Sequence, residues 1–233
     1  MHRGPHPDDH KLFSPEQVPS LRAATHDLSW LFERSYAPES ALKLVGDRYQ
    51  LKARQRAAVL RAACSDTQVH ARRARQLAPD QLRGQTLCID GFNIITSLEV
   101  ALSGGVLLIS RDGVIRDIAG VHGSYRSVEE TTPAITLIAS ITQTWGVAHC
   151  EIYLDEPVSN SGRLRAHILQ LAAANAWPIS VAVVRDPDSV LMSSKQVIAS
   201  ADSQILDAQV RWLNLARACI EQALPHANII DLR

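Results

Sequence analysis

From Gly84 onward, short apolar runs alternate with longer stretches in which apolar residues recur at helical spacing. A short apolar run bounded by turn residues predicts a buried strand, and a 3.6-residue period predicts an amphipathic helix. The predicted strands lie at 86–89, 150–154, 179–184 and 228–232, with a shorter apolar segment at 196–199, and the predicted helices lie at 133–145, 162–177 and 203–224. This alternation predicts the α/β class, with a mainly parallel sheet flanked by helices in a Rossmann-like three-layer arrangement.

One pair of apolar segments has a different pattern. Segments 105–110 and 114–118 flank Asp112-Gly113, a pair of residues that favours a tight turn between antiparallel strands. These segments predict a hairpin, in which Asp112 is interpreted simply as a turn residue.

The residues before Gly84 show helical periodicity only. Pro38-Glu39 places a proline just inside a helix start, and a longer helical stretch covers 49–63. Residues 1–12 are predicted to form a mobile terminus. We therefore expect two parts, a small basic α-helical region at 1–83 and an α/β domain at 84–233.

The 233 residues carry 24 basic and 24 acidic side chains, so the overall charge predicts no nucleic-acid partner. The charges are unevenly distributed, because ten Lys or Arg but three acids lie between Lys43 and Arg83. Such a basic run suits sequence-independent contact with a nucleic-acid backbone, for which Arg54 and Arg56 are candidates. It is equally typical of solvated helix faces, so both interpretations stay open.

Other features narrow the function class. The four cysteines contain no CxxC pair and indicate buried thiols in a reducing compartment. No apolar run approaches the length that spans a bilayer. We therefore expect a cytoplasmic protein without a membrane partner. The sequence contains no Walker A, G-x-G-x-x-G or G-x-S-x-G motif. It therefore gives no support to a nucleotide-cofactor fold or to an α/β-hydrolase.

Acidic residues follow several of the predicted strands. Asp90 and Asp155 each end an apolar run, and Asp202 follows the segment 196–199. Glu130, or its neighbour Glu129, precedes the helix predicted at 133–145. Because the carboxyl ends of parallel strands meet at one edge of a sheet, these acids can converge. Converging carboxylates repel one another unless a cation lies between them, and hard oxygen ligands select Mg²⁺ or Mn²⁺.

Three segments resemble a known family. Ile89-Asp90-Gly91-Phe92-Asn93 resembles the opening of NYN-type nucleases of the PIN-like group, and Tyr153-Leu154-Asp155-Glu156 with the small polar residues 159–162 resembles their middle segment. Ser200-Ala201-Asp202-Ser203 resembles their late segment. The whole chain also resembles a prokaryotic family of uncharacterised proteins that places a basic helical region before this domain. Its recurrent features include Arg48-Tyr49, Arg54-Gln55-Arg56 and the run from His122 to Arg126.

The resemblance implies a PIN-like fold and a divalent-metal-dependent endonuclease that cleaves RNA or DNA, with RNA the more expected substrate. By this analogy Asp90, Glu130, Asp155 and Asp202 are the catalytic residues and hold Mg²⁺ or Mn²⁺, and Asn93 orients Asp90 or a phosphate. The alternative is a non-catalytic module that binds nucleic acid or protein through a degenerate metal site. A homodimer is compatible with either function.

Further candidates for substrate binding surround these segments. Ser159 and Ser161 belong to the small polar loop, although Ser161 is also a natural helix cap. Arg163 follows that loop and is placed to contact a phosphate near a helix N-terminus, although an exposed helix face explains it equally well. Arg126 closes a polar cluster that begins at His122 and either lines the site or forms a plain loop.

Overall fold

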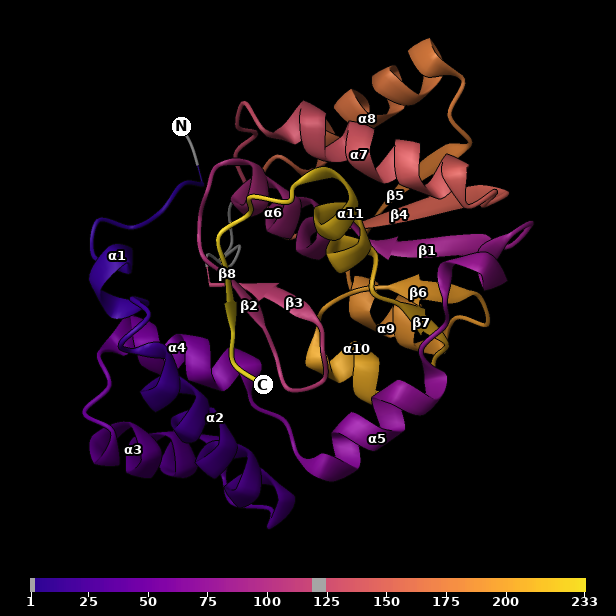
Figure 1. Cartoon of the computed structure of the whole chain (residues 1–233). Helices are drawn as coiled ribbons and strands as arrows, with labels where there is room; N and C mark the ends of the chain where they lie inside the picture. The colour runs from indigo at the N-terminus through magenta and orange to yellow at the C-terminus, as the bar shows by residue number, and fades with distance from the viewer. Residues whose placement is uncertain (1–2, 119–124) are drawn as a thin grey trace.

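The computed structural model describes residues 3–118 and 125–233 (Figure 1). Its main sheet has five parallel strands in the order β5-β4-β1-β6-β7, flanked by helices, which confirms the predicted α/β class. The strands are β1 (Thr86–Asp90), β4 (His149–Asp155), β5 (Ile179–Val184), β6 (Val197–Ala199) and β7 (Trp212–Leu213). The central strand β1 pairs with β4 on one side and with β6 on the other, so the carboxyl ends of these three strands are neighbours.

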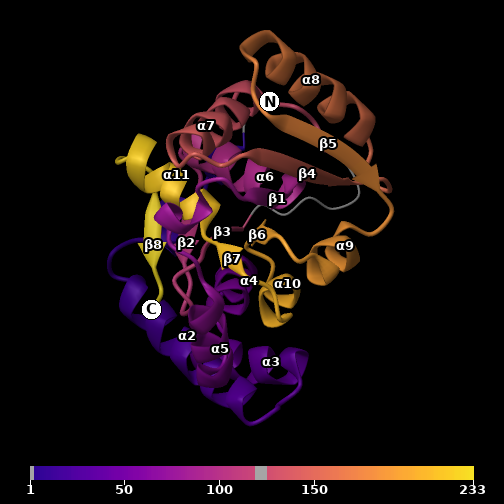
Figure 2. The same cartoon turned by 90° about the vertical axis from the view of Figure 1, so that its right-hand side faces the viewer.

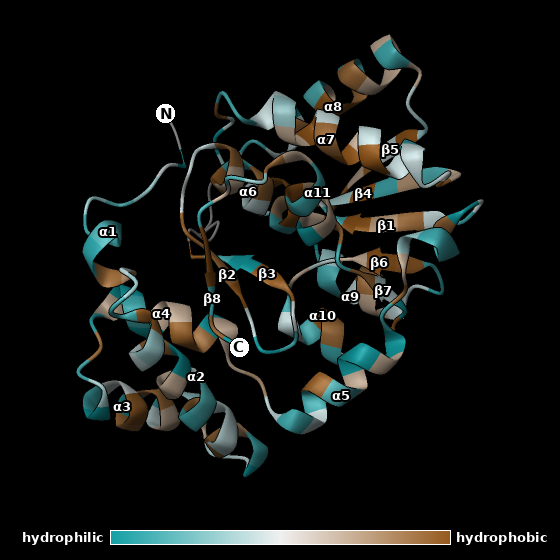
Figure 3. Cartoon of the chain, in the orientation of Figure 1, coloured by the Kyte–Doolittle hydropathy of each residue, from teal (hydrophilic) through white to brown (hydrophobic). Residues whose placement is uncertain are grey.

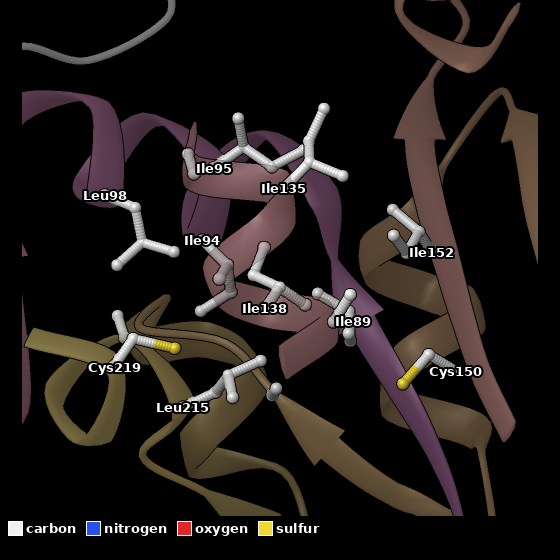
Figure 4. Close-up of a cluster of buried hydrophobic side chains, with 14 of the residues drawn as sticks. Ile89, Ile94, Ile95, Leu98, Ile135, Ile138, Cys150, Ile152, Leu215 and Cys219 are labelled. Atoms are coloured by element: carbon white, nitrogen blue, oxygen red, sulfur yellow. The ribbon is translucent and has the colours of Figure 1, made fainter. Parts of the chain in front are cut away.

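Helices pack on both faces of this sheet, although the second face is only partly covered at β4 and β5, where buried residues alternate with half-buried or exposed ones. Leu87 and Ile89 of β1 belong to a large core, part of which Figure 4 shows. Cys88, which points to the opposite face, packs in a smaller core with Leu191 and Ile205. The first core includes residues of α6 (Gly91–Leu102), α7 (Thr131–Thr144), α8 (Ser161–Asn175) and α11 (Leu215–Ala223), and the second includes residues of α9 (Pro187–Ser193) and α10 (Ser203–Asp207).

A separate three-stranded sheet has the order β3-β2-β8. The predicted hairpin is confirmed as β2 (Leu107–Ile109) and β3 (Ile115–Asp117), which are antiparallel. The predicted last strand exists as β8 (Ile229–Asp231), but it runs parallel to β2 in this sheet and takes no part in the main one. Figure 3 shows that β2 and β8 are mostly hydrophobic, which suits their position between two layers, where β2 is largely buried and β8 is half-buried.

The N-terminal helical region lies against this small sheet (Figures 1 and 2). Its core joins apolar side chains of the helices to Leu108 of β2 and to Leu232, which follows β8. The predicted small helical region is confirmed, and its helices are α1 (Asp9–Leu12), α2 (Val18–Glu33), α3 (Pro38–Arg48), α4 (Ala53–Ala62) and α5 (Asp66–Arg75), followed by a 3₁₀ turn at Pro79–Leu82. Within the described ranges, no helix is both long and apolar enough to cross a lipid bilayer.

Two predictions about local structure were wrong. Residues 3–12 are fixed to the rest of the protein, because buried Asp9 accepts hydrogen bonds from Arg54 and Arg3 forms an ion pair with Glu99. The helix predicted at 203–224 is interrupted, and residues 212–213 form β7 instead. The interruption lets Trp212 bury its ring completely and donate its indole N–H to the carbonyl oxygen of Arg72 at 2.8 Å. Tertiary packing therefore overrides the helical pattern there.

Gly91, the first residue of α6, lets that helix start in direct contact with β4. A methyl group at this position would lie 2.8 Å from a side-chain carbon of Ile152 and 2.8 Å from the carbonyl oxygen of Tyr153. We expect Gly91→Ala to lower the free energy of unfolding by about 1–3 kcal/mol through overpacking, as measured by urea denaturation. The matched control is Gly162→Ala in α8, where an added methyl group meets nothing within 4 Å. A Gly91→Ala variant as stable as this control would contradict the close packing.

Candidate functional site

Asp90 is the last residue of β1, and its carboxylate is buried at the carboxyl edge of the main sheet. Its Oδ2 accepts a hydrogen bond from Oγ of Ser200 at 2.7 Å. Burial is the main cause that raises the pKa of Asp90 to about 7, and the negative charges of Asp188 and Asp202 add to it against the opposing effect of Ser200. Asp90 is therefore a carboxyl group held in a site where its own negative charge is disfavoured.

Polar contacts fix the segment after β6 against the segment after β1. Ser200 Oγ also accepts a hydrogen bond from the backbone N–H of Asp202 at 2.9 Å. Asn93 Oδ1 accepts one from the backbone N–H of Ala201 at 2.8 Å. The backbone of Asn93 lowers the pKa of Asp90 through a hydrogen bond, whereas the Asn93 side chain contacts the neighbouring backbone. The predicted role of this side chain in orienting Asp90 or a phosphate stays a prediction.

Asp202 has an evident structural role as well as a place in the acidic group. Its Oδ1 accepts a hydrogen bond from the backbone N–H of Gln204 at 2.7 Å, so it caps the short helix α10. Its charge nevertheless raises the pKa of both Asp90 and Asp188. Capping and membership of the acidic group therefore coexist at this residue.

Asp188 is a member of the group that the sequence analysis missed. It lies in α9, and burial, followed by the charges of Asp202, Asp155 and Asp186, raises its pKa. Burial also raises the pKa of Asp155 at the end of β4, with a smaller effect of Asp186. Asp188 thus connects the carboxylate after β4 electrostatically with those after β1 and β6. The run Asp186-Pro187-Asp188 directly after the strand at 179–184 was a usable signal.

The carboxyl edge of the main sheet therefore gathers Asp90, Asp155, Asp188 and Asp202, which we call the acidic edge. Glu130 precedes α7 as its N-cap residue and is not among the main charges acting on Asp90, Asp155 or Asp188 in the described part of the chain. Next to Glu130 in the chain, Thr131 donates a hydrogen bond to the carboxylate of Glu99, and Tyr125 donates another. Glu99 is fully buried.

The predicted substrate-binding loop has mixed surroundings. Ser161 is buried and its Oγ donates to the carbonyl oxygens of Asp155 and Val158, so it shapes the loop. Ser159 is exposed, and its carbonyl oxygen accepts a hydrogen bond from the N–H of Tyr125 at 3.3 Å. Arg163 and Arg126 are exposed. The predicted polar cluster of residues 122–126 is described from Tyr125 onward, and its earlier residues lie outside the described ranges.

Several arginines of the basic run bind carboxylates of the protein itself. Arg54 contacts Asp9 through two nitrogens, at 2.5 and 2.9 Å. Arg56 donates to Asp47 Oδ1 at 2.8 Å and to the carbonyl oxygen of Leu51 at 3.0 Å. These two residues, predicted to contact substrate, therefore have structural contacts that compete with that role.

Asp112, Arg72 and Arg116 form a buried network of ion pairs that contacts the segment after β6. Asp112 accepts two hydrogen bonds from Arg116, both at 2.8 Å, and one from Arg72 at 2.5 Å. Arg116 also donates to the carbonyl oxygen of Ala201 at 2.8 Å, and Arg72 donates to Asp207 at 2.7 Å. The interpretation of Asp112 as a simple turn residue is therefore incomplete, because this carboxylate pairs with two buried arginines from α5 and β3.

The residue types of the acidic edge suit a divalent ion, but their arrangement is not that of a preformed metal site. The main charges acting on Asp90, Asp155 and Asp188 within the described residues are all negative, and carboxylate oxygens are the ligands that Mg²⁺ and Mn²⁺ prefer. However, no three His, Cys, Asp or Glu side chains among residues 3–118 and 125–233 are arranged to hold a metal ion. An ion that keeps several water molecules needs only one or two carboxylates, as is usual for Mg²⁺.

Two protein-family models match the sequence, one over most of the α/β domain and one over the helical region. Residues 79–218, more than half of the chain, match the family described as "Domain of unknown function (DUF5616)", and the chain belongs to this family. Residues 20–75 match "Protein of unknown function (DUF434)". The chain is 30% identical over 190 residues to Uncharacterized protein MJ0935 of Methanocaldococcus jannaschii. The aligned region covers 82% of this chain and 90% of that protein. No solved structure gives a significant match.

Proposed function

We propose that this protein is a divalent-metal-dependent endonuclease of the PIN-like type that hydrolyses RNA phosphodiester bonds at the acidic edge. The observation that carries the proposal is the group of four carboxylates on β1, β4, α9 and the segment after β6. Burial and like charge raise the pKa of Asp90, Asp155 and Asp188, and the main charges acting on these three carboxyl groups among the described residues are negative. A bound cation removes this repulsion and raises the affinity of the edge for a phosphate.

The resemblance of residues 89–93, 153–162 and 200–203 to NYN-type nucleases supports the same proposal, since all three segments lie at this edge. A site outside the carboxyl ends of parallel strands, where neighbouring connections leave the sheet in opposite directions, is also the usual place for a ligand in an open α/β sheet.

In this proposal some residues of the acidic edge bind the metal ion and another positions a ligand. Asp90, together with Asp188 or Asp202, would supply the one or two carboxylate ligands that a hydrated Mg²⁺ or Mn²⁺ needs, and Asp155 lies at the margin nearest the loop 159–162. Ser200 positions the Asp90 carboxylate through its 2.7 Å hydrogen bond. When bound, the ion supplies an activated water and neutralises the charge that develops on the phosphate. In this arrangement Asp188 takes the place that the resemblance gave to Glu130.

The test combines metal binding with cleavage. Wild type is compared with the double variant Asp90→Asn, Asp188→Asn in thermal unfolding with EDTA and with millimolar Mn²⁺. An ion present at about 100 times its Kd stabilises the native state by about 2.7 kcal/mol, and the double variant is expected to lose this gain. Asp80→Asn, a change at an exposed acid in the 3₁₀ turn, is the matched control and is expected to keep it. Cleavage of single-stranded RNA is measured on the same three proteins.

The second candidate is a non-catalytic module that binds nucleic acid or protein. The observation that favours it is the lack of a converging set of three ligands among the described residues. It requires RNA to stay intact in Mn²⁺ and Mn²⁺ to leave the stability of the wild type unchanged. Metal-dependent cleavage that disappears in the double variant removes this candidate.

We further propose that the protein works in the cytoplasm. Cys64, Cys88, Cys150 and Cys219 are all free and buried, as suits a reducing compartment. Cell fractionation of the tagged chain tests this, and recovery in a secreted or membrane fraction contradicts it.

A further inference from the structure

A groove runs along the exposed side of α4 and reaches the acidic edge. One hollow of about 610 Å³ lies between the N-terminal segment and the start of α4, and its lining includes Lys11 and Lys52. A second hollow of about 500 Å³ is lined by Arg61 of α4 and by Asp202. Ala57 and Ile118 line both hollows, so the two adjoin each other. We call this surface the α4 groove.

The α4 groove carries available positive charge. Lys11, Lys52 and Arg61 are all exposed. The two other arginines of its lining have partners within the protein, since Arg54 binds Asp9 and Arg116 binds Asp112. Exposed cations along a groove suit a ligand that repeats negative charge along its length, as a nucleic-acid backbone does.

The groove continues past Asp202 to an exposed aromatic ring. A third hollow, of about 530 Å³, shares Leu60, Ser203 and Gln204 with the second, and Tyr36 is part of its lining. The side chain of Tyr36 is 53% exposed. An exposed aromatic ring beside a charged groove can stack on a base, which requires that the base be unpaired.

We propose that single-stranded RNA binds along the α4 groove, with its phosphates on Lys11, Lys52 and Arg61 and a base on Tyr36. The strand passes Asp202, which belongs to both the groove and the acidic edge, and this brings a phosphodiester to the carboxylates. The N-terminal helical region is then the substrate-holding part of the protein. This inference rests on the proposed function for the meaning of the acidic edge, but binding in the groove requires no metal.

Binding is measured by the fluorescence anisotropy of a labelled single-stranded RNA of about 12 nucleotides, a length in the range of single-strand sites. EDTA is present, so cleavage cannot contribute. We expect the full-length double variant Lys52→Ala, Arg61→Ala to raise Kd about tenfold or more and to reduce the slope of log Kd against log salt by about 1.4, which is about 0.7 for each lost contact. Lys195→Ala is the matched control, because this exposed lysine lies before β6, at the opposite edge of the sheet.

The possible outcomes distinguish a failure of the proposed RNA site in the α4 groove from a failure of the proposed nuclease activity. If the double variant binds RNA as tightly as the Lys195→Ala control, or the wild type does not bind, the groove is overturned even when Mn²⁺-dependent cleavage is present. Loss of binding in the double variant supports the groove even when no cleavage occurs, and then the proposed function alone fails. A duplex of the same sequence that binds as tightly as the single strand, with no effect of Tyr36→Ala, overturns the single-strand assignment.

Discussion

Asp112→Ala is expected to lower the free energy of unfolding by about 3–5 kcal/mol, because it leaves two buried arginines without their shared carboxylate. The Asp112 side chain is fully buried, and those of Arg72 and Arg116 are 1% and 3% exposed. Neither arginine can be deprotonated at ordinary pH, so the loss cannot be avoided by neutralisation. Urea denaturation measures the change.

A matched control for this variant is Asp231→Ala. Asp231 also pairs with an arginine, Arg233, but the two side chains are 32% and 48% exposed. An exposed pair contributes about 0–1 kcal/mol, so the control should unfold almost as the wild type does. If the two variants are equally stable, the network around Asp112 contributes no more than a surface pair.

Asp112 also makes the free energy of unfolding depend on pH. Despite the desolvation that burial imposes, the charges and hydrogen bonds of Arg116 and Arg72 lower the pKa of Asp112 to about 2. A carboxyl group whose pKa falls on folding stabilises the native state above its unfolded pKa, and this contribution disappears as the pH falls through the folded pKa. About 2 kcal/mol should therefore be lost between about pH 4 and pH 2, and Asp112→Asn should lack this step in a comparison of unfolding at the two pH values.

Asp90→Asn is expected to abolish the proposed nuclease activity and to stabilise the protein when no metal is present. Loss of one ligand that acts in the transition state should reduce cleavage by at least about 100-fold. In EDTA at pH 8, the variant should gain about 2–4 kcal/mol, because a carboxyl group whose pKa rises to about 7 on folding opposes folding above its unfolded pKa. The amide keeps an oxygen that can accept the hydrogen bond from Ser200.

Opposite changes in activity and stability are what separate this variant from simple damage to the fold. Cleavage is measured with Mn²⁺, and the free energy of unfolding is measured in EDTA on the same preparation. The control is Ser200→Ala, which removes a hydrogen bond that lowers the pKa of Asp90 and should therefore destabilise the metal-free protein. An Asp90→Asn variant that is less stable than the wild type in EDTA shows that this carboxylate has a structural role.

The fold class and three of the four acids could be predicted because short apolar runs alternate with helical periods and because acids lie at or shortly after the ends of three of those runs. Asp188 was missed because no helix is predicted between the strand at 179–184 and the segment at 196–199, whereas Pro187 starts a short helix there that brings Asp188 near Asp202. Asp112 was missed for a different reason. A tight turn explains Asp-Gly completely at the level of sequence, and Arg72, its partner, lies 40 residues earlier. Partners so distant along the chain are determined by the tertiary fold.

The position of β8 has a consequence for synthesis of the protein on the ribosome. Helices α2 and α4 share their core with Ile230 and Leu232, and Arg22 of α2 donates a hydrogen bond to the carbonyl oxygen of Asp231 at 2.7 Å. These helices emerge first, but the strand that completes their core emerges last, after a delay on the order of ten seconds at ordinary rates of translation. During that delay the nascent helices expose apolar side chains such as Leu21 and Leu28, which are fully buried in the finished protein. The nascent N-terminal region therefore stays incompletely packed until β8 has left the ribosome.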